Sequence, residues 1–188
     1  VQKVFLEYAT GQSYENQYRF VLQTGLRTGE LVGLKWEDID FSKKTMNIQR
    51  SMEYRHSTGE WRGGEPKSKS GYRVVPLTDE AISILKDQKI KNKKIKVIPM
   101  EWNEFVFLCR KGTPVKNSTY DTALFKICDK AKISRFSMHI LRHTKISMLK
   151  SLEIKGILGG NRENEIRNRG TAKRRKKYPV QFTDKSRC

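Results

Sequence analysis

Hydrophobic residues recur every three or four positions along residues 14–34, which is the spacing of one face of a helix. The first such set comprises Tyr18, Val21, Leu22 and Leu26. A shorter apolar set follows at residues 31–34, and between the two lies Thr-Gly-Leu-Arg-Thr-Gly-Glu, in which two glycines flank Arg27. Because glycine interrupts helices, this pattern predicts two helices joined at a corner that carries Arg27.

The period falls to two in residues 45–50 and again in residues 72–76, where side chains alternate in character. Alternation of this kind is typical of strands with one buried face, so we predict a small three-stranded antiparallel sheet. Residues 63–71 are rich in Gly, Ser and Lys, and this composition favours a hairpin or loop tip. A basic tip between two strands suits a DNA groove.

Three later segments are predicted to be helical. Thr78 followed by two acidic residues is a typical helix start, residues 118–132 have helical spacing, and Ser137 is expected to cap a helix that carries His139. Residues 151–188 differ in kind, because they hold eleven Lys or Arg and four acidic residues with few apolar ones. We therefore predict a mainly helical α+β domain over residues 1–150 and a basic, poorly ordered tail over residues 151–188.

The composition favours a polyanionic partner. The 188-residue chain has 39 Lys plus Arg against 20 Asp plus Glu, for a net charge of +19. Such an excess indicates nucleic acid ahead of a membrane surface. The three cysteines lie far apart with no Cys-x-x-Cys pair, and no apolar run reaches the roughly 20 residues of a membrane span. We expect no bound metal, no membrane contact and a cytoplasmic location.

Three motifs follow one another in a definite order. They are Thr-Gly-Leu-Arg27-Thr-Gly-Glu, a basic loop ahead of Arg-Val-Val-Pro-Leu, and His139-Ile-Leu-Arg142-His-Thr. In this order and spacing they resemble the catalytic domain of the tyrosine recombinases, the phage-integrase family, and especially integrases of conjugative transposons. The resemblance covers Tyr14 to about Thr144, and it includes Leu-Lys-Trp-Glu-Asp-Ile-Asp at residues 34–40.

This resemblance implies a function. Members of the family integrate and excise mobile elements by site-specific DNA recombination, through a phosphotyrosyl intermediate and without a metal or other cofactor. Because the bond energy is kept in the protein–DNA linkage, the rejoining step needs no nucleotide.

The resemblance also implies roles that the residue types suit. Arg27 and Arg142 each offer a planar fork for the non-bridging oxygens of a phosphodiester. His139 lies at i and Arg142 at i+3, so both can address one phosphate, and the imidazole would exchange a proton with the tyrosine hydroxyl. The acid that protonates the leaving oxygen is Lys67 or Lys69. We favour Lys67, because it is expected at the end of a strand.

Two further residues are expected to support this site. Glu30, one helical turn from Arg27, is predicted to orient its guanidinium. His143 is predicted to have a chiefly structural role, either bonding to the backbone or packing behind the site.

The family pattern breaks down after Thr144. Relatives have Leu-Gly-His, or a tryptophan in place of that histidine, ahead of the nucleophilic tyrosine, whereas this chain has Gly160 at the histidine position. The only tyrosine after Arg142 is Tyr178, and Pro179 behind it would break the helix that presents a nucleophile. We therefore expect a truncated or frameshifted integrase, with Tyr178 as its one candidate nucleophile.

Double-stranded DNA is the expected partner. No counterpart of the helical core-binding domain that precedes the catalytic domain in relatives is seen ahead of the matched segment. Intact relatives act as tetramers on DNA, but the tail of this chain lacks an amphipathic helix suited to docking on a neighbour, so we expect a monomer. The alternative function is that of a non-catalytic DNA-binding remnant that retains only the basic surface.

Overall fold

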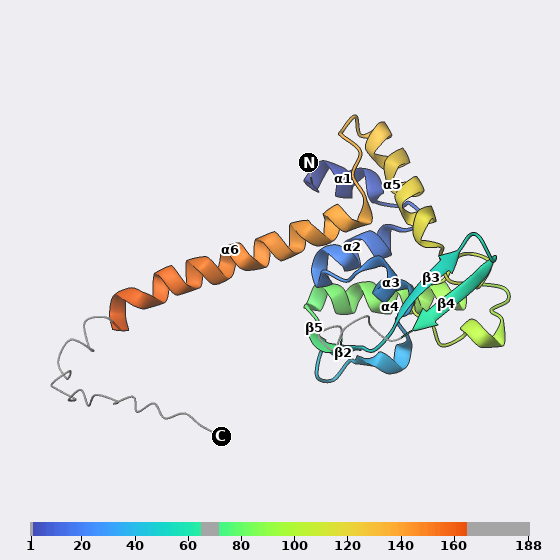
Figure 1. Cartoon of the computed structure of the whole chain (residues 1–188), viewed down its shortest axis with the longest axis horizontal. Coiled ribbons are helices and arrows are strands. Elements are labelled where there is room, and N and C mark those ends of the chain that lie inside the picture. The colour runs from blue at the N-terminus through green and yellow to red at the C-terminus, as the bar shows by residue number, and fades with distance from the viewer. Residues whose placement is uncertain (1, 65–71, 165–188) are drawn as a thin grey trace, which may run out of the picture. The chain divides into compact units, whose positions relative to one another are not determined.

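The computed structural model of the chain describes residues 2–64 and 72–164, with side chains as far as residue 151 (Figure 1). The helices in this part are α1 (Gln2–Ala9), α2 (Glu15–Thr24), α3 (Thr28–Val32), α4 (Asp79–Lys93), α5 (Asn117–Lys130) and α6 (Met138–Asn164), with short 3-10 helices η1 (Trp36–Asp38) and η3 (Met100–Trp102). The strands are β1 (Ile39–Asp40), β2 (Thr45–Ile48), β3 (Ser51–Arg55), β4 (Glu60–Gly64) and β5 (Arg73–Pro76). The predicted mainly helical α+β class is confirmed.

The chain divides into two compact units, Val1–Leu149 and Lys150–Cys188. Helix α6 continues past the boundary between them to Asn164, so helical backbone extends into the segment that we predicted to be poorly ordered. Residues 165–188 lie outside the described residues. The first unit carries the core and the candidate site.

Helices α2 and α4 lie side by side, α1 packs on α5, and α3 packs on β3 (Figure 1). The predicted apolar face of α2 is buried in this arrangement, with Tyr18 at 0% exposure and Val21 at 1%. Phe20 contacts Phe107 from the loop before α5, with ring centres 5.4 Å apart. Burial of these large side chains is the main stabilising contribution to the unit.

The predicted three-stranded antiparallel sheet is present, in the order β1-β2-β5. Strand β2 pairs with β5 in the register Met46↔Val75 and Ile48↔Arg73, which buries Met46 and Ile48. A second sheet, the two-stranded ribbon β3–β4, was not predicted. In this ribbon Tyr54 pairs with Trp61, and the two rings meet edge to face with centres 5.4 Å apart.

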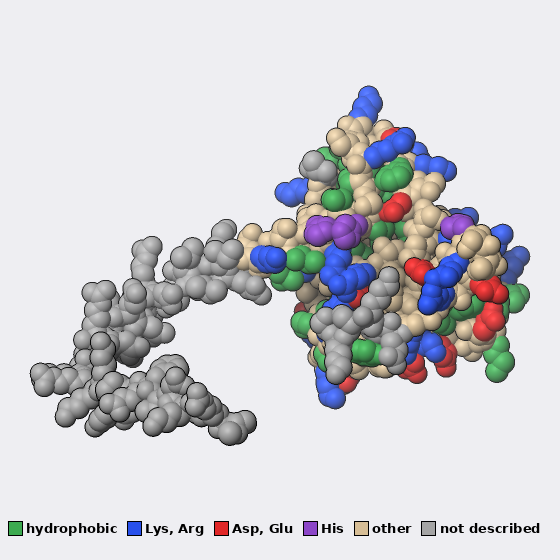
Figure 2. Space-filling view, viewed as in Figure 1, with side chains coloured by type: hydrophobic (Ala, Val, Ile, Leu, Met, Phe, Trp, Pro, Cys, Tyr) green, Lys and Arg blue, Asp and Glu red, His purple; other side chains and the backbone are tan. Residues whose placement is uncertain are grey.

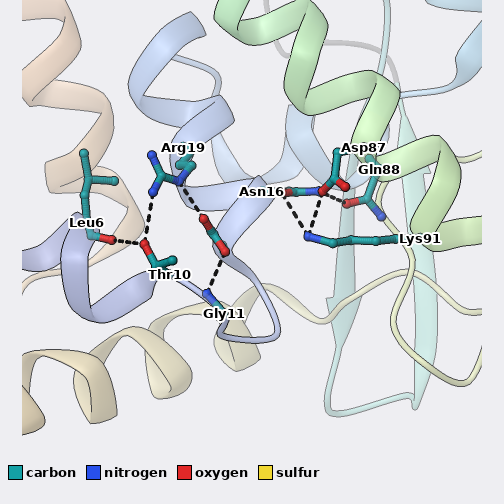
Figure 3. A network of polar contacts seen from close by, with 9 residues as sticks. Leu6, Thr10, Gly11, Asn16, Arg19, Asp87, Gln88 and Lys91 are labelled. Carbon is teal, nitrogen blue, oxygen red and sulfur yellow. Dashed lines mark hydrogen bonds and ion pairs between the residues drawn. The ribbon is translucent and has the colours of Figure 1, made fainter.

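A polar network joins the first turn of α2 to α4 (Figure 3). The Asn16 amide donates to Asp87 Oδ2 at 2.9 Å and to Gln88 Oε1 at 3.0 Å, and Lys91 Nζ donates to Asn16 Oδ1 at 3.2 Å. Gln88 in turn donates to Asn92 Oδ1 at 2.8 Å. Because Asn16, Gln88 and Asn92 are buried, these bonds satisfy groups that would otherwise be costly inside the protein.

Different atoms accept the first hydrogen bonds at the starts of two predicted helices. The Thr78 hydroxyl accepts from the Ala81 backbone N–H at 3.1 Å, as a helix cap should. At the start of α6, however, the Ser137 carbonyl rather than its hydroxyl accepts from Ile140 at 3.0 Å, and the Met138 N–H donates to Asp121 Oδ1 at 2.8 Å. Ser137 therefore lies directly before the helix as predicted, but its backbone carbonyl takes the capping contact.

Candidate active site

Arg27 lies at the corner between α2 and α3. Helix α2 ends at Thr24, and Gly25 follows with φ +67° and ψ +27°, a left-handed conformation that residues with a Cβ adopt at a cost. Arg27 returns to extended backbone just before α3, and its side chain is 59% exposed. The predicted corner is therefore present, and it leaves the guanidinium open to solvent.

Glu30 in α3 accepts four hydrogen bonds at this corner. Its Oε1 accepts from Nη1 of Arg27 at 2.8 Å and from Nη1 of Arg73 at 2.9 Å. Its Oε2 accepts from the backbone N–H of Arg27 at 2.9 Å and from Nη2 of Arg73 at 2.8 Å. Burial alone would raise the pKa of Glu30, but the hydrogen bonds from Arg73 and Arg27 outweigh it and lower the pKa to about 2. Glu30 is therefore charged at neutral pH.

Arg142 reaches the same corner from α6. Its Nη1 donates to the carbonyl oxygen of Gly25, so the left-handed turn that presents Arg27 also holds Arg142. Burial lowers the pKa of Arg142, the positive charges of Arg27 and Arg73 lower it further, and Glu30 opposes this shift. Three guanidiniums and one carboxylate therefore act on one another at this corner.

This arginine cluster, which we define as Arg27, Arg73 and Arg142 around Glu30, has the charge and shape to hold a phosphate group. One carboxylate offsets one of three positive charges, so two remain in excess. A guanidinium group can bind two phosphate oxygens through parallel hydrogen bonds. The bound anion is stabilised most when the cations are held in place before it binds.

Arg73 is the member of the cluster that sequence reasoning missed. We took it for an ordinary strand position, but it begins β5 and directs its side chain onto Glu30. The available signal was its place directly after the basic loop. Alternation alone does not say which face of a short strand meets a charged partner.

His139 and His143 lie one turn apart on α6, and both are exposed. Their Nε2 atoms are 2.8 Å apart and their ring centres are 4.3 Å apart, and Figure 2 shows histidine side chains on the surface among basic ones. The predicted packing of His143 behind the site is therefore wrong. The physical reason is helical spacing, since residues at i and i+4 share a face, and here that face is open to solvent.

Three predicted residues lie outside the described residues, namely Lys67, Lys69 and Tyr178. Their roles stay predictions. Gly160 falls within the helical backbone of α6, so the position at which relatives have a histidine is helical in this chain.

Two expectations concern what the site does not contain. Among residues 2–64 and 72–151, no group of three or more His, Cys, Asp or Glu side chains is arranged to hold a metal ion. In the described part of the chain, no helix is both long enough and apolar enough to cross a bilayer.

Comparison with known proteins places this geometry in a family. The sequence pattern of the phage integrase family matches residues 6–154. The XerC-like tyrosine recombinase of Caldanaerobacter subterraneus subsp. tengcongensis is 30% identical over 161 residues, which are 78% of this chain and 41% of that protein. The transposase of transposon Tn916 from Enterococcus faecalis is 32% identical over 131 residues, or 66% of this chain and 32% of that protein. The chain thus spans less than half the length of these curated relatives.

Solved structures agree with the sequence comparison. The Tn1549 transposon integrase in complex with circular intermediate DNA superposes with a TM-score of 0.67 at 26% identity, covering 80% of this chain and 52% of that one. The catalytic core of lambda integrase shares the fold, with a TM-score of 0.53 at 14% identity over 80% of both chains. Since the family pattern covers residues 6–154 and the same fold recurs in these integrases, the chain belongs to the phage integrase family of tyrosine recombinases.

Proposed function

We propose that this chain is the catalytic part of an integrase that cuts and rejoins double-stranded DNA in the cytoplasm, moving a mobile element into and out of a site. The observation that carries this proposal is the arginine cluster, in which two arginines from distant motifs meet at the Gly25 turn. Glu30 holds Arg27, and the Gly25 carbonyl holds Arg142. The family membership and the DNA named in the structures of its relatives support the same function.

In the proposed reaction, Arg27 and Arg142 bind the non-bridging oxygens of the scissile phosphate and stabilise the charge that develops there. The Tyr178 hydroxyl attacks phosphorus and gives up its proton to His139. The phosphorus–oxygen bond to the 5′ oxygen breaks, and Lys67 or Lys69 supplies the proton to that oxygen. The products are a 3′-phosphotyrosyl linkage and a free 5′ hydroxyl, and rejoining is the reverse of these steps with a partner strand.

A second candidate function is a DNA-binding remnant without strand cleavage. The observation that favours it is the sequence after Arg142, where Gly160 replaces a histidine and the sole tyrosine is followed by Pro179. Such a protein would keep the charge of the arginine cluster and bind the DNA backbone. It would form no covalent linkage to DNA.

A covalent-trapping assay separates these functions. The full chain is incubated with nicked duplexes that tile the two ends of the element carrying its gene, so that cleavage releases a short fragment and leaves the protein attached. Wild-type chain should form an adduct that resists boiling in detergent, but only at a low level, because the family pattern that presents the nucleophile breaks down after Thr144. Arg27→Ala and Arg142→Ala should each reduce adduct formation about 10²-fold or more, and Tyr178→Phe should abolish it.

The matched control is Arg135→Ala, which removes an exposed arginine that pairs with Asp129 outside the cluster. It should leave adduct formation within about twofold of wild type. Binding of the duplexes by all variants, without an adduct from any, would instead support the remnant. Lys67→Ala and Lys69→Ala are compared on one duplex to identify the acid that protonates the leaving oxygen. A substrate with a better leaving group should restore adduct formation only in the variant that lacks this acid.

Assembly follows from the same proposal. We infer that this chain is a monomer in solution. A tetramer on paired DNA sites is expected only for intact relatives. Light scattering of the free chain should report a mass near 22.0 kDa. A stable tetramer without DNA would contradict this inference.

A further inference from the structure

The exposed pair of histidines on α6 brings two ring nitrogens close together. The Nε2 atoms of His139 and His143 are 2.8 Å apart, the ring centres are 4.3 Å apart, and the ring planes are nearly perpendicular at 87°. A linear N–H···N bond at this length would put the ring centres about 5 Å apart, since each centre lies about 1.2 Å behind its nitrogen. At least one ring is therefore turned away from the line that joins the two nitrogens.

These separations fit one transition-metal ion bound by both nitrogens. Metal–imidazole bonds are about 2.0–2.1 Å long, so two nitrogens at a right angle around one ion lie about 2.9 Å apart with ring centres about 4.5 Å apart. At a tetrahedral angle the same bonds require about 3.3 Å and about 5.2 Å. The observed separations of 2.8 Å and 4.3 Å match the right angle and not the tetrahedral one.

We propose that His139 and His143 form a chelating site for one divalent transition-metal ion that prefers right-angle coordination, Cu(II) or Ni(II) ahead of Zn(II). Two histidines at i and i+4 on a helix are a recurrent metal-binding arrangement. Both rings are exposed, so the ion reaches them without opening the fold. In the bound form each ring keeps a proton on Nδ1 and gives the Nε2 lone pair to the metal.

The site has two protein ligands and open positions. No third His, Cys, Asp or Glu completes a metal-binding group with these histidines among the residues whose side chains are described, so water or an anion fills the remaining positions. The positive charge of Arg142, which precedes His143 in α6, opposes a dication and weakens its binding.

Metal binding would switch off the proposed reaction, a consequence that rests on the proposed function whereas the metal site itself does not. The ion takes the Nε2 lone pair of His139, the atom that is free to accept the tyrosine proton. Strand cleavage should therefore stop while the ion is bound and resume when it is removed by a chelator.

The test titrates the full-length chain, its thiols blocked with N-ethylmaleimide, with Ni(II) followed by isothermal calorimetry. Wild-type chain should bind one Ni(II), and His139→Ala and His143→Ala should each weaken the apparent affinity at least about tenfold. The control is His56→Ala, because His56 is the remaining histidine of the three in the chain and its Nε2 contacts Ser118 Oγ at 3.3 Å instead. This variant should bind as wild type does, and thermal melting confirms that each variant is folded.

Three results would overturn the proposal: no Ni(II) binding, binding unaffected by His143→Ala, or tighter binding of Zn(II) than of Ni(II), which is the reverse of the proposed metal preference. The second measurement is adduct formation with and without Ni(II), with each variant compared with its own metal-free rate. Wild type should be inhibited and recover with EDTA, whereas His143→Ala should lose most of its sensitivity. Failure of the adduct assay in all samples would count against the proposed function, while calorimetry would still decide the metal site.

Discussion

Arg73 on strand β5 and Glu30 on helix α3 form a two-pronged ion pair, with Nη1 and Nη2 of the arginine 2.9 and 2.8 Å from the two carboxylate oxygens. Glu30 also binds the side chain and backbone of Arg27. The sheet is thus tied to the residue that we expect to bind phosphate. The carboxylate is nearly inaccessible, since Glu30 is 3% exposed. Removing one of its partners therefore costs more stability than removing a partner of a surface acid.

Loss of the Arg73 side chain should destabilise the protein and weaken the site. Arg73→Ala leaves two of the four hydrogen bonds to Glu30 unmade, and we expect about 2–3 kcal/mol less stability in urea unfolding. Arg73→Lys should lie between this variant and wild type, because lysine keeps the charge without the fork. Adduct formation should fall about tenfold or more in Arg73→Ala, because Arg73 no longer holds Glu30, the carboxylate that positions Arg27.

Arg135 provides the matched comparison for this prediction. It makes an equally short two-pronged pair with Asp129, at 2.8 Å for both bonds, but the two side chains are 62% and 49% exposed. Arg135→Ala should therefore cost less than about 1 kcal/mol. Equal losses of stability in the two variants would show that burial of Glu30 does not set the cost.

The fold and part of the site follow from local patterns. The corner at Arg27 follows from two glycines between two apolar sets, and the three-stranded sheet follows from alternation in residues 45–50 and 72–76. The predicted contact of Glu30 with Arg27 is present, because helical spacing determines it, although its catalytic role stays a prediction. These features depend on neighbours in the chain.

Features that depend on distant segments were not predicted. The pairing of Arg73 with Glu30 requires the register of β5 against β2 and the packing of α3 beside them, and no periodicity encodes both. The β3–β4 ribbon was missed although Met52 and Tyr54 alternate with polar residues and Gly59 supplies a left-handed turn at φ +72°. In that case a local signal existed, and the nearby Gly-rich segment obscured it.

Stability should depend on the ionisation of Glu30 in acid. Its pKa is lowered from 4.5 to about 2, so the folded state holds the carboxylate charged where the unfolded state takes up a proton. The contribution, about 3 kcal/mol, is complete above pH 4.5 and is lost as the pH falls toward 2. Urea unfolding between pH 6 and 3 should show this decline. Glu30→Gln should be less stable at pH 6 and have a flatter profile, and parallel profiles would contradict the assignment.

The polar network between α2 and α4 predicts a loss of stability when Asn92 is replaced. Asn92 donates to the Val106 carbonyl at 2.9 Å and accepts from Gln88 at 2.8 Å. Asn92→Leu, similar in size, leaves both partners unpaired inside the protein, so we expect about 2–3 kcal/mol lower stability in urea unfolding. Asn47→Leu on the exposed face of β2 should change stability by less than about 0.5 kcal/mol. A loss at position 92 no larger than this would mean that water replaces the missing bonds.

The left-handed turn at Gly25 connects backbone conformation with the proposed chemistry. A Cβ at this position would meet the Lys145 side chain at 3.5 Å, an ordinary contact, so Gly25→Ala should cost about 1–2 kcal/mol through its φ of +67° and not through a clash. Gly11→Ala is the control, because Gly11 has φ +76° and open space around it. Both variants should lose similar stability in urea unfolding. Only Gly25→Ala should reduce adduct formation, since any shift of its carbonyl moves Arg142. If Gly11→Ala reduced adduct formation equally, lower stability rather than Arg142 placement would explain both results.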